Sequence, residues 1–255
     1  MPEDTTQAPV PAIRDWRLDV ARLIDINGAV RRIRLGGPGL GELDYLPGQD
    51  MAVSIPTDAG DGSDGVVKRR YTICEVDRVV ESVDIEVVLH GDGPGARWAR
   101  GVMPGQKVEV VAPRGKITLA AAANRHLFIG DDSAIPAIMA MVAALPPGKV
   151  AHVLLEVGSE DEERELSSAE GVEVVTSWLH REDREAGSPE LLVAATERME
   201  IQSAGAHAYA FGEFGVVRSL RAVLEGKSFA PEQVSAKAYW RLGLRNAPHG
   251  EPVKD

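Results

Sequence analysis

The sequence contains little sulfur and few aromatic rings. Its 255 residues include a single cysteine, Cys74, and aromatic residues make up 5% of the chain. One cysteine excludes an internal disulfide and a thiolate-rich metal or iron–sulfur site, and the six histidines include no pair at the spacing of metal ligands. We therefore predict no structural metal. The low cysteine content, together with a polar and acidic beginning unlike a secretory signal, predicts a cytoplasmic location.

Long hydrophobic runs and an excess of positive charge are also missing. No apolar run approaches the roughly 20 residues that a membrane-spanning helix needs, so no stable membrane insertion is expected. The 28 Lys and Arg residues are outnumbered by 39 Asp and Glu residues, which gives a formal net charge of −11. Surfaces that bind nucleic acid are basic, so nucleic acid is not an expected partner. The chain is long enough to bury sizeable hydrophobic cores. We expect it to be a monomer.

The first half of the sequence has the pattern of a small antiparallel barrel. From Arg17 to about Leu119, short segments that alternate apolar and polar residues, such as 83–87 and 107–110, are separated by turns rich in Gly and Pro. Evenly spaced short strands with such turns are typical of an antiparallel β-barrel. We predict a β-barrel domain over residues 13–120.

The pattern changes near residue 120. Residues 126–130 are a compact apolar strand, and the helix expected after it has apolar residues at helical spacing, including Ile138 and Met141. Apolar strands that alternate with helices indicate a parallel α/β sheet. We predict an α/β domain over residues 121–246, flexible ends at 1–12 and 247–255, and a cleft between the two domains. Further strands are expected at 150–157, 172–175 and 207–211, and helices near 189–199 and 216–225.

Two motifs in the first half suit a flavin dinucleotide. The strand Arg70-Tyr71-Thr72 offers a cation for a phosphate, an aromatic ring for a flat cofactor and a hydroxyl for the polar edge of that cofactor. The turn at 93–95 opens a helix through Trp98, whose free backbone amides suit a second phosphate oxygen. Taken singly, each motif is also compatible with an ordinary barrel strand and an ordinary helix start. Together they favour a flavoprotein.

These two motifs, followed by further matching segments in the same order along the chain, resemble the siderophore-interacting protein family. Members of this family are FAD-dependent ferric-siderophore reductases related to the ferredoxin reductases. The resemblance covers about residues 17 to 245. It implies a two-domain ferredoxin-reductase-like fold, with an N-terminal antiparallel β-barrel for FAD followed by an α/β parallel-sheet domain for NAD(P)H. The matching segments are 70–72, 90–99, 112–115, 130–138, 177–181, 211–213, 217–221 and 239–243.

The resemblance also implies contacts for each cofactor. The residues expected to bind FAD are Arg70, Tyr71, Thr72, Ile73, His90, Gly93, Pro94, Gly95, Ala96, Trp98 and Trp240. Those expected to bind NAD(P)H are Gly130, Asp131, Asp132, Ser133, Ala134, Pro136, Arg181, Gly212 and Glu213. No catalytic side chain beyond the flavin itself is expected.

Two positions depart from the family pattern. Cys74 stands where the family commonly has an arginine, so one possible basic contact is lost. Its thiol could be redox-active, although a small buried hydrophobic residue is the simpler interpretation. Gly95-Ala96 stands where the family commonly has Ala-Ser, which removes a hydroxyl that could bind FAD but leaves the backbone amides.

The segment after the first α/β strand is unusual for a nucleotide site. Asp131 and Asp132 would repel a pyrophosphate, so the simplest interpretation is that Asp132 or Ser133 caps the following helix. The acidic residues after the second α/β strand, at 160–163, favour the free ribose hydroxyl of NADH over the 2′-phosphate of NADPH. Arg181, after the next strand, could instead supply a cation for that phosphate.

Basic residues flank both segments that are assigned to the flavin. They are either ordinary surface charges or a basic rim that attracts an anionic ferric siderophore, the expected small-molecule substrate. The residues of this predicted rim are Lys68, Arg69, Lys237, Arg241 and Arg245.

The predicted activity is transfer of electrons from NAD(P)H through FAD to chelated Fe(III), which releases Fe(II) for iron assimilation. Flavin suits this task because it accepts two electrons from a nicotinamide and releases them singly. Two alternatives remain open. One is a diaphorase-like flavoprotein reductase whose acceptor is a quinone, free flavin or a protein. The other is a carrier of flavin or an iron chelate with no enzymatic activity.

Overall fold

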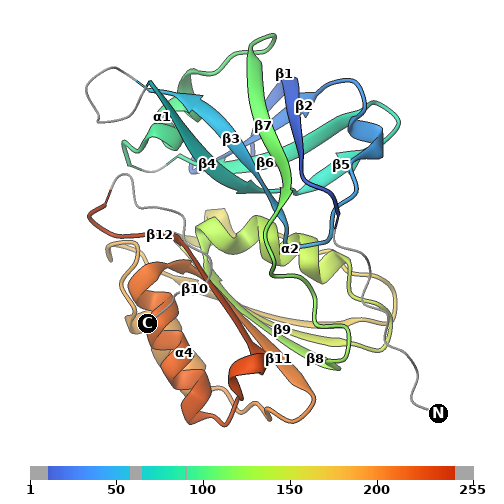
Figure 1. Cartoon of the computed structure of the whole chain (residues 1–255). Helices are drawn as coiled ribbons and strands as arrows, with labels where there is room; N and C mark the ends of the chain where they lie inside the picture. The colour runs from blue at the N-terminus through green and yellow to red at the C-terminus, as the bar shows by residue number, and fades with distance from the viewer. Residues whose placement is uncertain (1–10, 58–64, 90, 245–255) are drawn as a thin grey trace, which may run out of the picture.

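The computed structural model describes residues 11–57, 65–89 and 91–244, and each half of the chain has a sheet of its own (Figure 1). His90 and Arg245, which were predicted to bind FAD and substrate, lie outside the described residues. So do the predicted flexible ends, apart from residues 11 and 12. No helix in the described part of the chain is long and apolar enough to cross a membrane.

The N-terminal half is a strongly curved antiparallel sheet. Alternation of side chains places Leu18, Ile33 and Ile85 in one apolar core on its inner face. Its seven strands are β1 (Arg14–Asp25), β2 (Val30–Gly36), β3 (Asp50–Pro56), β4 (Val66–Thr72), β5 (Glu75–Asp77), β6 (Ser82–Val88) and β7 (Lys107–Arg114). They lie in the order β4-β3-β7-β1-β2-β6-β5. Since the described residues show no pairing between the end strands β4 and β5, the predicted barrel is an open half-barrel.

Two short elements complete this half. The 3-10 turn η1 (Leu40–Glu42) contributes Leu40 to the core. Helix α1 (Pro94–Gly101) follows β6 and packs Ala99 against the same core. Pro94 stands in the first turn of α1, where its missing amide proton costs no hydrogen bond.

The C-terminal half is a parallel sheet with helices on both faces, as the sequence pattern predicts. Ile138 and Met141 of α2 pack on one face, whereas Leu192 of α3 and Leu220 of α4 pack on the other. Its strands are β8 (Arg125–Asp131), β9 (Val150–Val157), β10 (Glu173–His180), β11 (Ala206–Glu213) and β12 (Val234–Trp240), in the order β10-β9-β8-β11-β12. Its helices are α2 (Ile135–Ala143), α3 (Glu190–Arg198) and α4 (Phe214–Gly226), with 3-10 turns η2 (Asp132–Ala134), η3 (Glu160–Glu162) and η4 (Pro231–Gln233).

Two strands of this sheet differ from the sequence expectation. The strand expected at 172–175 runs on to His180, because β10 pairs with β9 along its whole length, from Glu173 opposite Val150 to His180 opposite Val157. The last strand, β12, has no strong apolar pattern and was not predicted. It forms because its backbone pairs with the edge of β11. Cross-strand pairing, rather than local composition, sets both boundaries.

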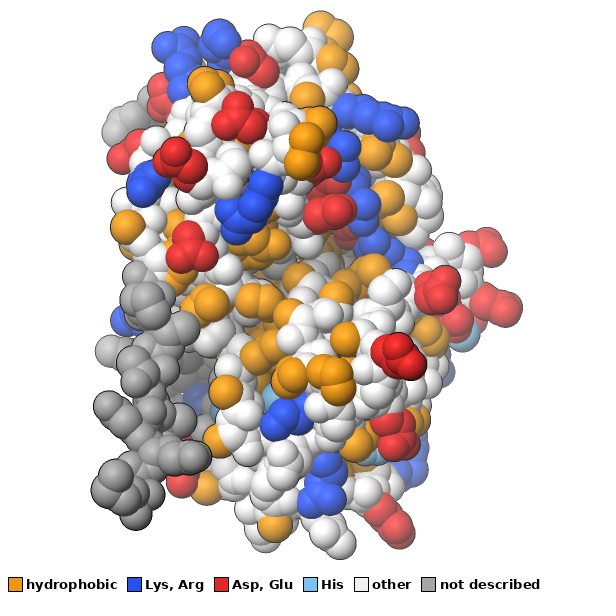
Figure 2. Space-filling view, turned by 90° about the vertical axis from the view of Figure 1, so that its right-hand side faces the viewer, with side chains coloured by type: hydrophobic (Ala, Val, Ile, Leu, Met, Phe, Trp, Pro, Cys, Tyr) orange, Lys and Arg blue, Asp and Glu red, His pale blue; other side chains and the backbone are white. Residues whose placement is uncertain are grey.

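The order of the strands creates a switch point in the middle of the parallel sheet. After β8 the chain moves outward to β9 and β10, then returns to place β11 on the other side of β8. Loops leave the carboxyl ends of β8 and β11 in opposite directions, and ligands of open α/β sheets bind at such a point. Helix α2 lies between the two sheets (Figure 1). On the face that Figure 2 shows, apolar side chains run between the two halves, and acidic and basic side chains are intermixed over the N-terminal half.

Candidate functional site

A cleft with a volume of about 240 Å³ opens between the two halves. The half-barrel contributes β4 and the ends of β6 and α1 to its wall, and the α/β half contributes η2, α2 and β12. Its lining residues are Val30, Asp50, Arg69, Arg70, Tyr71, Thr72, Glu86, Val87, Val88, Gly93, Ala96, Asp132, Ser133, Pro136, Lys237, Ala238, Tyr239, Trp240, Arg241 and Leu244. The fold thus brings together side chains from both motifs of the first half and from the α/β segment that begins at Asp132.

Tyr71 is held from behind by helix α1. Its ring stacks on Trp98, with 6.3 Å between ring centroids and 26° between planes. A Cβ atom at Gly95 would overlap the Tyr71 hydroxyl oxygen, so the absence of a side chain at Gly95 lets the helix approach. Burial raises the pKa of the Tyr71 phenol, which keeps it neutral. Trp98 does not line the cleft and instead supports the ring that does.

The wall around Tyr71 offers two kinds of anion-binding group. Arg69 and Arg70 line it from β4. Helix α1 begins at the Gly93 cap without a side-chain hydrogen bond and without an acid in its first turn, so the amides of its first turn are suited to bind an anion. Gly93 and Ala96 of this helix start line the same cleft. Of the other predicted FAD contacts, Ile73 and Pro94 are buried and do not line the cleft.

Asp131 organises the α/β wall and does not face the cleft. It accepts hydrogen bonds from the amide and hydroxyl of Ser133, from the Glu213 amide at 2.9 Å and from Trp240 Nε1 at 2.9 Å. Gly212 has a φ of +132°, and a Cβ there would lie 2.5 Å from Asp131 Oδ2. Asp131, rather than the predicted Asp132 or Ser133, therefore caps the turn that leads into α2, because its carboxylate accepts the Ser133 amide at the start of η2.

The remaining predicted nicotinamide contacts divide into two groups. Asp132, Ser133 and Pro136 line the cleft. Gly130 and Ala134 are packed beneath them, where a Cβ at Gly130 would lie 2.5 Å from the Ala134 methyl group. Glu213 is buried and caps helix α4 through Val216 N at 2.9 Å. It contributes to the support of the wall and does not line the cleft.

Beneath this wall, Arg181 lies near three carboxyl groups and contacts two of them, Asp132 and Glu156. Arg181 is 7% exposed, donates to Asp132 Oδ2 at 2.8 Å and lies 3.5 Å from Glu156 Oε1. Asp131 accepts several hydrogen bonds, Asp132 and Glu156 both face Arg181, and Glu156 Oε2 has no hydrogen-bond partner among the described residues. Burial raises the pKa of Glu156 to about 7, Asp131 and Asp132 act in the same direction, and Arg181 opposes them. Burial and the neighbouring Asp132 also raise the pKa of Asp131, to about 6, so of these two groups Glu156 keeps its proton to the higher pH.

A Glu156→Gln substitution is expected to flatten the pH dependence of stability. The folded chain holds the Glu156 proton more tightly than the unfolded chain, whose pKa is near the ordinary 4.5. This stabilisation is complete below about pH 4.5 and is lost as pH rises through about 7, so the wild type loses about 1–3 kcal/mol over that range. Thermal unfolding between pH 5 and 8 measures the effect. Glu173→Gln, an exposed acid on β10, is the control and should follow the wild type. Equal pH slopes for Glu156→Gln and wild type would refute the assignment.

Of the residues predicted to form a basic rim, some line the cleft and others do not. Arg69 and Arg241 line the cleft, and Arg241 lies over the Phe214 ring at 4.6 Å from its centroid. Lys68 is exposed but does not line the cleft. Lys237 also lines the cleft, but it is buried and is not a surface cation. It is 7% exposed, and its Nζ donates to Asp50 Oδ2 at 2.7 Å, because a buried ammonium needs a carboxylate partner.

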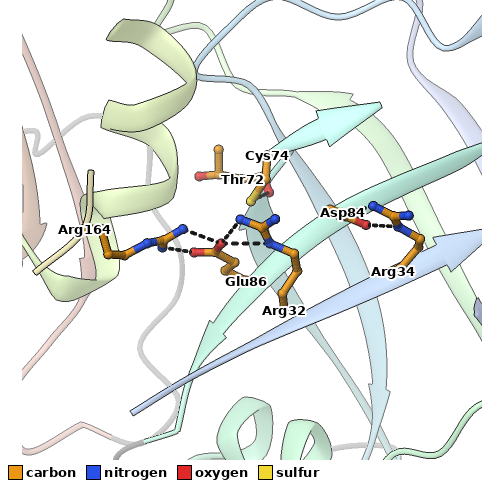
Figure 3. Close-up of polar contacts among 7 residues, drawn as sticks. All are labelled: Arg32, Arg34, Thr72, Cys74, Asp84, Glu86 and Arg164. Carbon is orange, nitrogen blue, oxygen red and sulfur yellow. Dashed lines mark hydrogen bonds and ion pairs between the residues drawn. The ribbon is translucent and has the colours of Figure 1, made fainter. Parts of the chain in front are cut away.

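Sequence reasoning missed the buried acids that hold these cations. Asp50 accepts from Arg70 Nε at 2.8 Å as well as from Lys237. Glu86 accepts from Arg32 Nη2 at 2.7 Å and from Arg164 Nη2 at 2.9 Å (Figure 3). A signal for the second group was present, since 30–35 and 83–87 alternate with charges of opposite sign at matching spacing. The register pairs Arg32 with Glu86 directly across β2 and β6.

Cys74 lies beside this group and not in the cleft. Its Sγ is 3.6 Å from the Thr72 carbonyl oxygen, to which it donates (Figure 3). Burial and the nearby Glu86 raise the pKa of the thiol, while Arg32 and Arg164 oppose them, so it stays protonated. A protonated thiol is a weak nucleophile, which favours the packing role over the redox role.

The site residues suit a dinucleotide with an aromatic ring at one end. One wall combines a ring backed by Trp98, two guanidinium groups and uncapped helix amides, which are the donors that a ring and a pyrophosphate require. The opposite wall is the switch point of a parallel sheet. A half-barrel with such a wall, followed by a parallel α/β sheet, is the two-domain arrangement of the ferredoxin-reductase-like class of proteins. No set of three or more His, Cys, Asp or Glu side chains in the described ranges could hold a metal ion.

Comparison with known proteins identifies the family. Residues 123–243 match the family described as "Siderophore-interacting protein", and residues 56–117 match "Siderophore-interacting FAD-binding domain". The ferric vibriobactin reductase ViuB of Vibrio cholerae is 30% identical over 189 residues, which cover 72% of this chain and 68% of ViuB. The chain therefore belongs to the siderophore-interacting protein family.

Other relatives differ in the share of their length that aligns with this chain. A Mycobacterium tuberculosis protein is 33% identical over 187 residues, which are 69% of this chain but 65% of that protein. The chain thus spans slightly under two thirds of this relative. The NADPH-dependent ferric-chelate reductase of Escherichia coli is 24% identical over 249 residues, which cover 89% of this chain and 93% of the reductase.

Solved structures confirm the fold class. A siderophore utilization protein from T. fusca superposes with a TM-score of 0.83 at 26% identity and covers 93% of this chain and 96% of its own. The ferredoxin-NADP+ reductase of Plasmodium falciparum gives a TM-score of 0.64 at 12% identity, covering 88% of this chain and 96% of its own. The second likeness shows the fold alone, and that fold is the predicted ferredoxin-reductase-like arrangement.

Proposed function

We propose that this chain is an FAD-dependent ferric-siderophore reductase that takes electrons from NAD(P)H and releases Fe(II) from its chelate. The observation that carries the proposal is the cleft, in which the Tyr71 wall of the half-barrel faces the switch point of the α/β sheet. When bound, FAD supplies the exchange between a two-electron donor and a one-electron acceptor. The names of the Vibrio and Escherichia relatives support the same activity.

The proposal divides the work between the two walls. Tyr71 would hold the flavin ring, with Arg70 and the amides at the start of α1 binding the pyrophosphate. Thr72 would bind the polar edge of the ring through its hydroxyl. Ser133 and Pro136, at the start of α2, would orient the nicotinamide. Trp240 would close the site from β12, where Asp131 holds its indole at 2.9 Å.

The geometry favours NADH over NADPH as the electron donor. Arg181, the one cation that the sequence suggested for a 2′-phosphate, is buried and paired with Asp132 and Glu156. The turn after β9 is acidic, and Glu162 Oε2 already accepts the Gly158 amide at 2.9 Å. Against this, the Escherichia coli relative is called NADPH-dependent, so both donors belong in the test.

The proposed substrate is an anionic ferric siderophore that approaches the cationic edge of the cleft. Arg69 and Arg241 both line the cleft, one from each half of the chain, and Arg241 is exposed. A positive edge concentrates an anionic chelate there. The cytoplasmic location and the monomeric state remain predictions from the sequence.

The test is reduction of a ferric siderophore by the FAD-loaded protein. With excess NADH, a ferrous-specific chelator is expected to capture Fe(II) released from the siderophore. The same assay with NADPH is expected to release Fe(II) more slowly. Absence of Fe(II) with both donors would refute the proposal. Faster turnover on quinones than on ferric chelates would favour the diaphorase-like alternative. A flavin colour that NAD(P)H does not bleach without oxygen would favour a carrier.

A further inference from the structure

Two buried carboxylates of the half-barrel each bind one cation from each half of the chain. Asp50, on β3, accepts from Arg70 of β4 at 2.8 Å and from Lys237 of β12 at 2.7 Å. The exposed fractions of the Lys237 and Asp50 side chains are 9% and 4%. This ion pair joins two residues that are 187 positions apart in the sequence and belong to different halves.

Glu86 repeats this arrangement on β6. Its carboxylate accepts from Arg32 of β2 at 2.7 Å and from Arg164 Nη2 at 2.9 Å, and Arg164 comes from the segment between η3 and β10. Figure 3 shows the Glu86 carboxylate between the two guanidinium groups. The exposed fractions of the Arg164 and Glu86 side chains are 11% and 2%, so water screens this pair weakly.

The two carboxylates line the same cleft, whereas Arg164 does not. Each is already paired with an arginine of its own half, so the second cation is not needed to neutralise it. What the second cation adds is a short contact across the junction. Two such contacts at separate points restrain rotation of one half relative to the other. A single contact would still allow the halves to rotate about that point.

We propose that Arg164 is a positioning residue for hydride transfer, and that with Lys237 it fixes the α/β wall relative to the Tyr71 wall. The inference rests on the proposed function, in which the nicotinamide and the flavin ring are held by different halves. Reaction between groups held on two bodies requires near-contact geometry, and a misplacement of about 1 Å can cost about 10²-fold in rate. Arg164 acts through Glu86 and without touching either cofactor.

The first test uses the protein without ligands. Arg164→Met is expected to speed amide hydrogen exchange by about 10-fold in the segments at 70–76 and 158–165, which lie on the two sides of the Arg164–Glu86 contact. Exchange in α4 should stay unchanged. Lys107→Met, which breaks an exposed ion pair with Asp19, is the matched control and should alter neither segment. Unchanged exchange at both segments would overturn the inference, whether or not the protein proves to be a reductase.

The second test separates positioning from cofactor binding. In a single turnover without oxygen, Arg164→Met is expected to slow flavin reduction by NADH about 10- to 100-fold while the FAD dissociation constant stays within about twofold of wild type. Reduction by dithionite, which needs no bound nicotinamide, should be unaffected. Arg164→Lys, which keeps the charge but not the bidentate geometry, should recover part of the rate. An Arg164→Met rate within twofold of wild type would contradict the inference, as would a parallel loss of FAD.

If Arg164→Met does not fold, Glu86→Gln tests the same contact, and its FAD dissociation constant must stay within about twofold of wild type because Glu86 itself lines the cleft. It keeps the side-chain shape and weakens both arginine contacts, so it should slow flavin reduction in the same direction. A wild-type protein whose flavin neither nucleotide reduces would refute the proposed function. In that case the exchange experiment alone decides whether Arg164 fixes the junction.

Discussion

Tyr71→Ala is expected to weaken FAD binding by about 30- to 150-fold. The ring is the one aromatic surface that the half-barrel presents to the cleft in the described part of the chain, and Trp98 and the backbone of Gly95 hold it in place. Removal of a buried aromatic contact of this size costs about 2–3 kcal/mol. Titration of the FAD-free protein with FAD, followed by quenching of flavin fluorescence, measures the change.

Tyr71→Phe is the matched control for this prediction. It keeps the stacking ring and removes the hydroxyl that lies against Gly95. Its FAD affinity should stay within about threefold of wild type, because ring contact supplies most of the binding free energy. If Tyr71→Ala binds FAD as tightly as Tyr71→Phe, the assignment of Tyr71 to the flavin ring is wrong.

Asp50→Ala is expected to lower the free energy of unfolding by about 3–5 kcal/mol, the usual cost of removing one partner of a buried ion pair. Arg70 and Lys237 would lose the carboxylate that both bind. Both cations would stay buried, and a buried charge without its partner destabilises the fold. The loss should also loosen the junction, since Lys237 comes from the α/β half. Urea unfolding followed by tryptophan fluorescence gives the measurement.

Asp19→Ala is the control, because Asp19 is also an acid paired with a lysine but lies on the surface. The side chains of Lys107 and Asp19 are 56% and 48% exposed, and such pairs contribute about 0–1 kcal/mol. Asp50→Ala should therefore be the far more destabilising variant. Equal unfolding midpoints for the two variants would show that the Asp50 group does not stabilise the junction.

Local motifs led from the sequence to residues that line one cleft. Tyr71 and the helix start at Gly93 each depend on residues next to them in the chain, so their residue types predict a binding surface before the fold is known. The fold then brings both to one cleft. The same holds for the alternation of apolar strands and helices after residue 120, since each element buries a face that its own sequence defines.

Sequence reasoning was incomplete where a residue's state depends on distant partners. Lys237 was expected at the surface, yet it is buried because Asp50 lies beside it, 187 positions away in the chain. Arg181 was a candidate for a 2′-phosphate, yet it is already bound by Asp132 and Glu156. The alternating charges on β2 and β6 could have predicted the pair of Arg32 with Glu86, because cross-strand register follows from the apolar pattern. Arg164 could not have been added to that pair, since no local pattern connects it to β6.

The sequence by itself determined the two-domain architecture and the family, because hydrophobic periodicity and short motifs act over a few residues, and it selected Tyr71 and the helix start at Gly93, which share one cleft. Only the tertiary structure decided which charged side chains pair with one another, both in the cleft wall and beneath it. The protonation state of an ionisable side chain depends on its burial and on the charges and hydrogen bonds around it, and in these groups both are set by the packing of distant parts of the chain.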